Sequence, residues 1–269
     1  MGNRRTGITL LSVALLGVCL VAATRPASST SEPARKVSLD LGNGLSMEMF
    51  LIPAGKFLMG SPEGEKGRST NEGPLHEVTI SRAFYMGVFE VTQEQYEAVM
   101  GKDPSHFKGA KNPVETVSWH DAVDFCKKLA EKTGKKVRLP TEAEWEYACR
   151  AGSKTRFCFG DDETDLRDHT WYTANSDSKT HPAGEKTPNA WGLYDMHGNV
   201  WEWCSDCWAV SYANAKNEDP QGPASGAFRV LRGGGWNVNP TYCRSALRFR
   251  SSPDDRYLNL GFRVAVDSR

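Results

Sequence analysis

The chain has 269 residues, of which 39% are hydrophobic, and its 33 Lys and Arg residues balance its 33 Asp and Glu residues. This length and composition are typical of one compact domain behind a short leader. Zero net charge gives no general attraction to nucleic acid or to anionic lipid, and the sequence has no basic cluster interleaved with aromatic residues. We therefore expect no nucleic-acid partner.

The N-terminus has the pattern of an export signal. Arg4 and Arg5 precede an apolar run at residues 8–23, in which Val21 and Ala23 are small enough for signal peptidase. The pattern predicts cleavage after Ala23 and an exported protein, located in a periplasm, on a cell surface or outside the cell.

The predicted organisation is a signal peptide at residues 1–23, a flexible spacer at 24–36 and one domain at 37–269. The apolar run is shorter than the roughly 20 residues of a membrane span, so we expect no span after leader cleavage. Lipidation of Cys19 is disfavoured because the preceding Val18 is large. Retention of the leader as an uncleaved anchor is the alternative.

Six cysteines follow the leader. Export would place them in an oxidising compartment, which makes each a candidate for a disulfide, and the sequence does not decide the pairing. Cys204 and Cys207 form a C-x-x-C pair, but no second pair completes a tetrahedral zinc site. The six are Cys126, Cys149, Cys158, Cys204, Cys207 and Cys243.

The predicted elements of the domain start with strands. Two apolar stretches within residues 47–59 are separated by Pro53 and Gly55, which predicts a hairpin with its turn there. Polar and apolar residues alternate at 76–80, as in a half-buried strand. The polar, glycine-rich residues 61–74 predict a loop.

Three helices are marked by capping boxes. Residues 92–95, 118–121 and 141–144 each place a Ser or Thr cap three residues before an acid or amide. The third box predicts a helix that ends at Gly152 and carries Trp145 on its buried face.

The half of the chain after Arg150 loses regular periodicity. Its aromatic residues are separated by Gly, Asn, Asp and Pro, which predicts loops with late strands at 229–232 and 261–266. Such backbone cannot satisfy its hydrogen bonds through ladders, so buried aromatic residues, disulfides or calcium ions would have to hold it. The expected fold class is α+β with little regular secondary structure.

Residues 192–203, GLYDMHGNVWEW, have the composition of a binding site. Gly192 and Asn199 allow left-handed backbone, while Asp195 and Glu202 bring oxygen ligands of the kind that calcium prefers into the turns. The alternative is that Asp195 caps a turn and Glu202 pairs with a surface base. The spacing alone does not decide between the two.

Seven motifs occur in the order of one known family. They are GKFLMGS (55–61), EVTQEQY (90–96), NPVETVSWHDAVDFCKKL (112–129), RLPTEAEWEYACRAG (138–152), NAWGLYDMHGNVWEWCSD (189–206), RVLRGGGW (229–236) and GFRVA (261–265). From about Met47 to Val266 the chain resembles the formylglycine-generating enzymes, also called the sulfatase-modifying-factor family. The resemblance implies the family's variant of the C-type lectin fold, with a loop-rich C-terminal half.

The resemblance also implies calcium ligands in this chain. The family's calcium site corresponds to the side chains of Asp195 and Glu202 and to the backbone carbonyls of Gly198 and Val200. A second family site begins at a stretch similar to the one that contains Asn175 and Ser176, but its downstream acid is not evident. Calcium is therefore expected as a structural ion, with Asn175 and Ser176 as weak candidates for a second site.

The chain departs from the family at the redox centre. Family oxidases convert a client cysteine to formylglycine with oxygen and a copper ion held by two thiolates, a ligand pair that suits Cu(I). Here Val238 stands in place of the first cysteine, and Gly235 replaces a serine of the motif. Only Cys243 is left as a catalytic candidate, and a buried or disulfide-bonded Cys243 is the alternative. We do not expect copper.

The favoured function is an exported binding module whose ligand is a protein or peptide, with a sulfatase as one candidate. The alternative is a divergent formylglycine-generating-type oxidase that acts on a cysteine or serine of exported sulfatases. An iron-dependent oxygenase is disfavoured because no triad of histidines and a carboxylate is evident. The candidate contact residues of the binding surface are Trp236, Asn237, Asn239, Tyr242, Arg244, Arg248, Phe249, Arg250, Arg256 and Tyr257.

Overall fold

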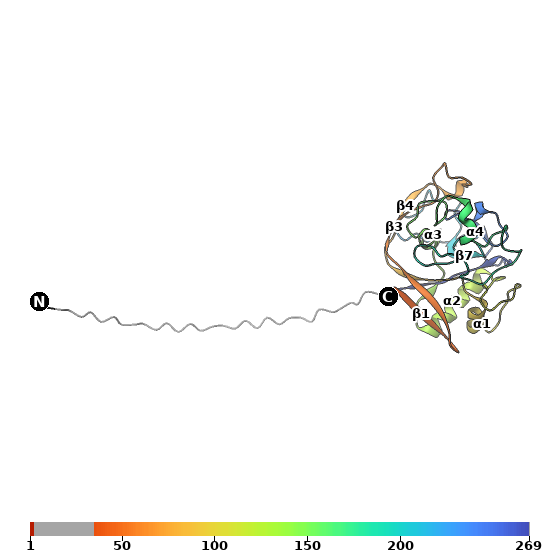
Figure 1. The fold of residues 1–269 in the computed structure, drawn as a ribbon, viewed down its shortest axis with the longest axis horizontal. Coiled ribbons are helices and arrows are strands. Elements are labelled where there is room, and N and C mark those ends of the chain that lie inside the picture. Colours follow the sequence, from red (N-terminus) through yellow and green to blue (C-terminus); the bar gives the residue numbers. More distant parts are fainter. Residues whose placement is uncertain (3–34, 269) are drawn as a thin grey trace. The chain divides into compact units, whose positions relative to one another are not determined.

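The computed structural model describes residues 1–2 and 35–268, and Figure 1 shows their fold. The predicted leader and most of the spacer lie outside the described residues, so signal-peptide cleavage and export stay predictions. None of the helices in the described part has the length and apolar composition needed to cross a bilayer.

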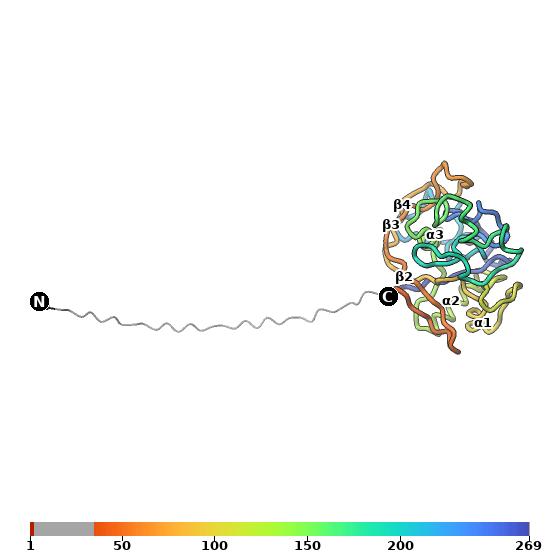
Figure 2. Tube along the Cα trace, in the orientation of Figure 1, coloured from red at the N-terminus to blue at the C-terminus, as the bar shows by residue number. Residues whose placement is uncertain are grey.

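A five-stranded sheet contains both ends of the described domain. Its order is β1-β2-β5-β11-β6, and all neighbours are antiparallel. Segments from both ends of the sequence, orange and blue in Figure 2, therefore lie in the same part of the molecule. The strands are β1 (Lys36–Gly42), β2 (Leu45–Ile52), β5 (Phe84–Gly87), β11 (Ala265–Asp267) and β6 (Val137–Arg138).

The alternation of side chains along these strands divides the core in two. Met49 and its neighbours pack with Phe125 and other residues of α1 (Gln93–Met100) and α2 (Trp119–Thr133). Ile52 and Met86 face the other way and pack with Trp145 of α3 (Glu142–Arg150). Figure 1 shows α1 and α2 on one side of the sheet and α3 on the other.

All three predicted capping boxes are confirmed. Thr92, Ser118 and Thr141 each accept the backbone N–H three residues on, and the side chain there returns a hydrogen bond to the cap. α3 ends at Arg150, and its C-cap is Ala151, in a left-handed conformation with φ 46°, one residue before the predicted Gly152.

A second sheet of four strands has the order β10-β7-β8-β9. β8 (Arg229–Arg232) agrees with the predicted late strand. The strand predicted at 261–266 is divided between β10 (Leu260–Gly261) and β11, because the chain leaves one sheet for the other between them. The remaining strands are β7 (Trp201–Cys207) and β9 (Phe249–Ser251).

The predicted hairpin around Pro53 is wrong. β2 pairs with β1 and β5, whereas β3 (Gly55–Met59) pairs with β4 (His76–Ile80) in a separate two-stranded sheet. The turn at Pro53 is thus a crossover between sheets. The real hairpin joins β1 to β2 through Gly42, Asn43 and Gly44, which all have positive φ (83°, 55° and 78°), as Asn and Gly readily do.

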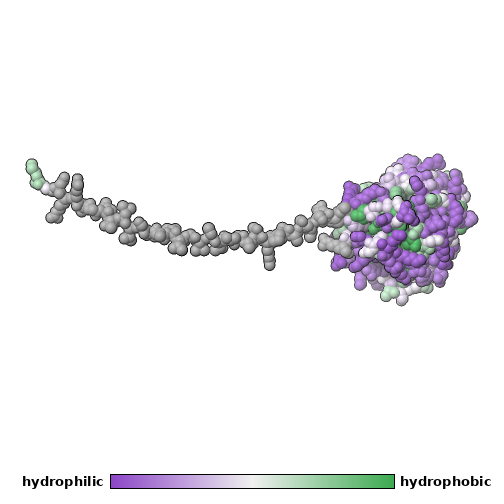
Figure 3. Space-filling view, turned by 90° about the horizontal axis from the view of Figure 1, so that it is seen from below, coloured by the Kyte–Doolittle hydropathy of each residue, from purple (hydrophilic) through white to green (hydrophobic). Residues whose placement is uncertain are grey.

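The rest of the described chain is mostly loop, as the composition after Arg150 predicted. Its short helical turns are η1 (Thr70–Glu72), η2 (Glu163–Asp165), α4 (Leu166–His169) and η3 (Pro240–Cys243). Polar side chains cover most of the face shown in Figure 3, with apolar residues in small separate patches.

Candidate functional site

The segment at residues 192–203 folds as a series of turns that leads into β7. Gly192, Asp195 and Asn199 take the left-handed conformation, with φ of 86°, 57° and 63°. Gly198 lies so close to another loop that a Cβ there would be 2.3 Å from the carbonyl oxygen of Trp171. The glycines of this motif therefore serve close backbone packing.

The two acids of this segment are buried but differ in their partners. Glu202 receives two hydrogen bonds from Arg263, both of 2.6 Å, and a third from the indole nitrogen of Trp145 at 2.7 Å. Asp195 accepts one bond from the backbone of Gly184 at 2.7 Å, while its Oδ1 is buried without a hydrogen-bond partner. An orphaned buried carboxylate oxygen is costly unless a further donor or a cation reaches it.

The structure adds a third acid, Glu90, that the sequence analysis missed. Its carboxylate is 1% exposed and lies 3.3 Å from the side-chain nitrogen of Asn199 and 3.3 Å from the backbone nitrogen of Val200. Glu90 belongs to the EVTQEQY motif just before the cap of α1. Its place in this motif was the only hint in the sequence. The residues around Glu90 do not indicate that it packs against Asn199 and Val200, more than a hundred positions away.

Burial raises the pKa values of Glu90 and Asp195. The pKa of Glu90 lies well above its usual range because of burial and then the charges of Asp195 and Glu202. Burial likewise raises the pKa of Asp195 to about 6. Three buried carboxyl groups thus lie near one guanidinium, that of Arg263, which hydrogen-bonds to Glu202, so ionisation of all three would leave excess negative charge in the interior.

This cluster has the donor chemistry of a hard cation site but not a finished coordination shell. Within residues 35–268 no three His, Cys, Asp or Glu side chains already converge on one metal position. Arg263 occupies both oxygens of Glu202, whereas Oδ1 of Asp195 is free to bind a cation. Carboxylates are ligands that calcium prefers, and Glu90 and Asp195 are the carboxyl groups of this cluster that Arg263 leaves without a hydrogen bond.

The weak second-site candidates are already engaged in holding their own loop. Oδ1 of Asn175 accepts the backbone N–H of Tyr172 at 2.9 Å. Ser176 donates to the carbonyl of Trp236 at 2.8 Å, and its own carbonyl lies 2.7 Å from the ring of His181. These contacts tie Asn175 and Ser176 to neighbouring loop segments, and the second calcium site stays a prediction.

Cys243 is buried in an apolar cluster. It is fully buried beside Phe157, Leu166 and Val238. In the described part of the chain its thiol has one hydrogen-bond partner, the carbonyl of Asn239 at 3.9 Å. Burial raises the pKa of the Cys243 thiol far above its usual range, so the sulfur stays protonated and is a poor metal ligand. All six cysteines of residues 35–268 are free thiols.

A buried histidine, His197, supports the Cys243 backbone. Its Nδ1 lies 2.7 Å from the carbonyl oxygen of Cys243 and donates to it, while its Nε2 accepts the backbone N–H of Cys158 at 3.0 Å. These two bonds fix the neutral tautomer. Burial lowers the pKa of His197 to about 4, partly offset by the bond to the Cys243 carbonyl. His197 therefore joins distant segments as a neutral residue.

Two of the predicted contact residues are not on the surface. Arg244 is fully buried and pairs with Glu65 and Glu72. Arg248 is 3% exposed and donates two hydrogen bonds, of 2.6 and 2.8 Å, to Glu142. Their assignment to the binding surface is wrong, because buried carboxylates compensate their charges inside the fold.

The other predicted contact residues are partly or fully exposed. Trp236 packs edge-on against Phe107, with ring centroids 5.5 Å apart, and its indole N–H donates to the Leu258 carbonyl. Tyr242 and Tyr257 are 40% and 52% exposed. The side-chain oxygen of Asn237 accepts a hydrogen bond from the Asn259 amide, and Asn239 is the N-cap of η3. Arg256 forms an ion pair with Asp121. We refer to Trp236, Asn237, Asn239, Tyr242, Arg256 and Tyr257 as the C-terminal face.

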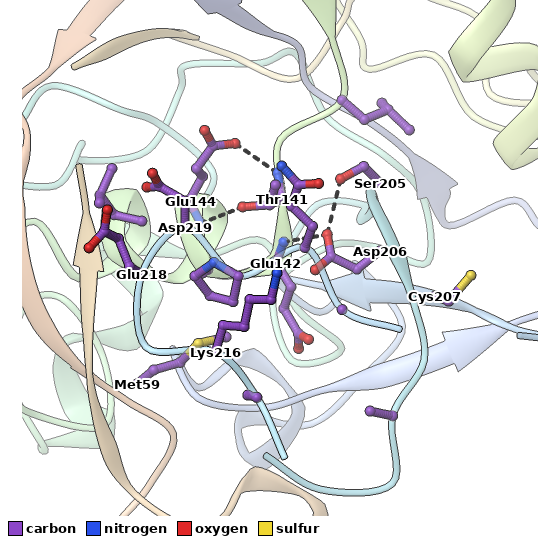
Figure 4. Close-up of a pocket in the computed structure, with 18 of the residues that line it drawn as sticks. Met59, Thr141, Glu142, Glu144, Ser205, Asp206, Cys207, Lys216, Glu218 and Asp219 are labelled. Atoms are coloured by element: carbon purple, nitrogen blue, oxygen red, sulfur yellow. Dashed lines mark hydrogen bonds between the residues drawn. The ribbon is translucent and has the colours of Figure 1, made fainter. Parts of the chain in front are cut away.

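A large groove of the described residues lies elsewhere. It has a volume of about 1870 Å³ and runs between the N-terminus of α3 and the loop after β7 (Figure 4). Asp206 lines it and accepts the backbone N–H of Glu142 at 2.9 Å, and burial together with the charge of Glu142 raises the pKa of Asp206 to about 7. Of the predicted site residues only Arg248 reaches this groove.

His197 gives the domain a specific acid sensitivity. The folded pKa of about 4 lies below the ordinary 6.5, so the neutral ring stabilises the fold fully above pH 6.5 and progressively less as pH falls towards 4. The shift corresponds to about 3 kcal/mol. We expect His197→Gln to reduce the stability loss between pH 7 and pH 5, measured by urea unfolding. His120→Gln, at an exposed histidine, is the control, and equal losses in wild type and His197→Gln would contradict this role.

Comparison with known proteins shows which family this chain resembles. The Sulfatase-modifying factor enzyme 1-like domain matches residues 42–268. The formylglycine-generating enzyme of Mus musculus is 32% identical, over 82% of this chain and 75% of its own length. The formylglycine-generating enzyme of Streptomyces coelicolor is 33% identical, over 81% and 88%.

Solved structures agree with the sequence relatives. Treponema denticola variable protein 1 is similar with a TM-score of 0.80 and 34% identity, over 86% of this chain and 99% of its own. PvdO from Pseudomonas aeruginosa is similar with a TM-score of 0.79 and 34% identity, over 88% and 99%. The likeness confirms the predicted variant of the C-type lectin fold. The chain therefore belongs to the sulfatase-modifying-factor family, the family of the formylglycine-generating enzymes.

Proposed function

We propose that this protein is a recognition module of its family and does not generate formylglycine with copper. The observation that carries the proposal is the environment of Cys243. A copper site of the family type needs two thiolates, and here the position of the first holds Val238. Val238 packs against the cluster that buries Cys243, so the remaining sulfur is protonated and surrounded by carbon.

The C-terminal face supports recognition of a protein or peptide ligand. Its exposed side chains are aromatic rings, amides and a guanidinium, the groups that are enriched at protein interfaces. Several are already oriented by contacts within the fold, such as Trp236 by Phe107 and Asn237 by Asn259, which reduces the entropy lost on binding. An exported sulfatase is one candidate ligand because the family modifies such proteins.

A divergent oxidase that acts on a cysteine or serine of exported sulfatases is the alternative function. It would have to use Cys243 in a different role, after an opening of the cluster around Phe157 and Leu166. The burial of that sulfur favours the recognition module over this alternative.

We propose further that calcium binds at Glu90 and Asp195 and stabilises the turns of residues 192–203. The support is the orphaned Oδ1 of Asp195 and the excess of buried carboxylate over guanidinium. A divalent cation bound there supplies the positive charge that Arg263 alone does not.

The oxidase alternative is tested with a peptide that contains C-x-P-x-R, incubated with copper and oxygen. We expect no aldehyde, assayed by hydrazide labelling, because the chain lacks the thiolate pair. The formylglycine-generating enzyme of Streptomyces coelicolor serves as the positive control. Aldehyde formation by this chain would refute the recognition proposal. Val238→Cys alone should also give no product, since Gly235 and the burial of Cys243 remain.

The calcium proposal is tested by the melting temperature of Asp195→Asn in calcium and in chelator. The pKa of Asp195 is raised from 3.8 to about 6, so its ionisation costs stability as pH rises through about 6 when no cation is bound. At pH 7 in chelator the variant should therefore melt at or above the wild-type temperature. With calcium the wild type should gain about 3 kcal/mol at a hundredfold excess over Kd, and the variant little.

Controls separate calcium binding from general destabilisation. Glu90→Gln should behave like Asp195→Asn. Asp206→Asn removes another buried carboxylate with a raised pKa, at the groove beside α3, and should leave the calcium increment unchanged. An equal calcium increment in wild type and Asp195→Asn would exclude this site.

A further inference from the structure

Aromatic rings and guanidinium groups alternate in a ladder beside β9. The ring of Trp208 lies between Arg248, 4.5 Å away, and Arg250, 5.5 Å away. On the inner side Arg248 also stacks on Tyr212 at 4.1 Å, and on the outer side Arg250 stacks on Phe228 at 4.8 Å. The ladder thus runs from the buried Tyr212 to the exposed Phe228, which is 39% exposed.

The two arginines of the ladder differ in one respect. The charge of Arg248 is paired, because the carboxylate of Glu142 accepts two hydrogen bonds from it inside the fold. Arg250 is exposed, and within residues 35–268 its guanidinium has ring contacts but no ion pair or hydrogen bond. Trp208 and Phe228 give this guanidinium cation–π contacts, which leave its N–H donors available. The outer arginine is oriented like the inner one but lacks an anionic partner.

Arg250 also belongs to a strand with a free edge. β9 is the last strand in the order β10-β7-β8-β9, and in the described chain it pairs with β8 alone. Phe249, the preceding residue, is 49% exposed and packs its ring on Trp201 at 5.4 Å. Free backbone groups on such an edge can accept an added strand, and the exposed rings provide apolar contact beside it.

We propose that Arg250 binds a carboxylate side chain of an acidic, extended segment of a protein partner that lies along the edge of β9. The planar guanidinium suits a two-bond contact to a carboxylate, the geometry that Arg248 and Glu142 already show in the same ladder. A nucleic acid or a membrane would require a cluster of unpaired cations, whereas this ladder offers one exposed guanidinium. The site goes beyond the proposed function, because docking at β9 is compatible with recognition and with modification of the partner alike.

The test uses fluorescein-labelled Ac-Val-Glu-Val-Glu-Val-NH2 and its Gln-for-Glu counterpart, with binding measured by fluorescence anisotropy at low salt. The acidic peptide should bind the wild-type chain at least about tenfold more tightly than the amide peptide. Arg250→Gln should remove this difference, and Arg250→Lys should retain part of it because the charge stays while the planar fork is lost. Both variants should melt at the wild-type temperature, since Arg250 is exposed.

Arg167→Gln is the matched control, because Arg167 is an exposed arginine on α4. It should bind the acidic peptide as the wild type does. Failure of the wild type to bind the acidic peptide, or equal binding by Arg250→Gln, would overturn the proposal. Strand docking is contradicted if a backbone N-methylated acidic peptide binds equally well and millimolar phosphate displaces it, since Arg250 would then be a simple anion site. Aldehyde formation in the peptide assay would overturn the recognition module but not this site.

Discussion

Buried arginine and carboxylate pairs hold the irregular half of this domain together. Arg263 binds Glu202 and also donates to the backbone carbonyl oxygens of Gly87 and Tyr194. Arg232, fully buried, does the same for Ser245 and Leu247 while it pairs with Glu146. Loops that cannot satisfy their own backbone thus obtain donors from guanidinium groups, whose charge a neighbouring acid compensates. Loss of one partner would leave a buried charge, at a cost of about 3–5 kcal/mol.

These pairs also position the candidate sites. Arg263 bonds to both carboxylate oxygens of Glu202, whereas Oδ1 of the neighbouring Asp195 has no hydrogen-bond partner. Arg244 and its acids fix the C-terminal end of η3, the turn that carries the partly exposed Tyr242. The buried arginines therefore decide which acids stay without an ion pair and which nearby side chains stay at the surface, and these are the residues of the proposed sites.

Local patterns in the sequence predicted the local structure well. The capping boxes at Thr92, Ser118 and Thr141 gave the three main helices, because a cap and its return bond involve residues only three apart. The order of motifs gave the family and hence the fold. The hairpin around Pro53 was mispredicted because two apolar stretches with a turn between them look the same whether they pair with each other or with other strands. Strand partners are a long-range property that alternation does not encode.

The site was harder to predict for the same reason. Asp195 and Glu202 were found from one short segment, but Glu90 and Arg263 approach it from distant positions. The sequence does not show whether an arginine is buried or exposed. Only the neighbours in space distinguish the buried, ion-paired Arg244 and Arg248 from the exposed Arg250. This arrangement divides the C-terminal stretch into anchors and outward positions. Replacement of Asn237, Tyr242 or Tyr257 changes the outer surface without disturbing a buried charge, so the sequence of this stretch can vary while the fold is preserved.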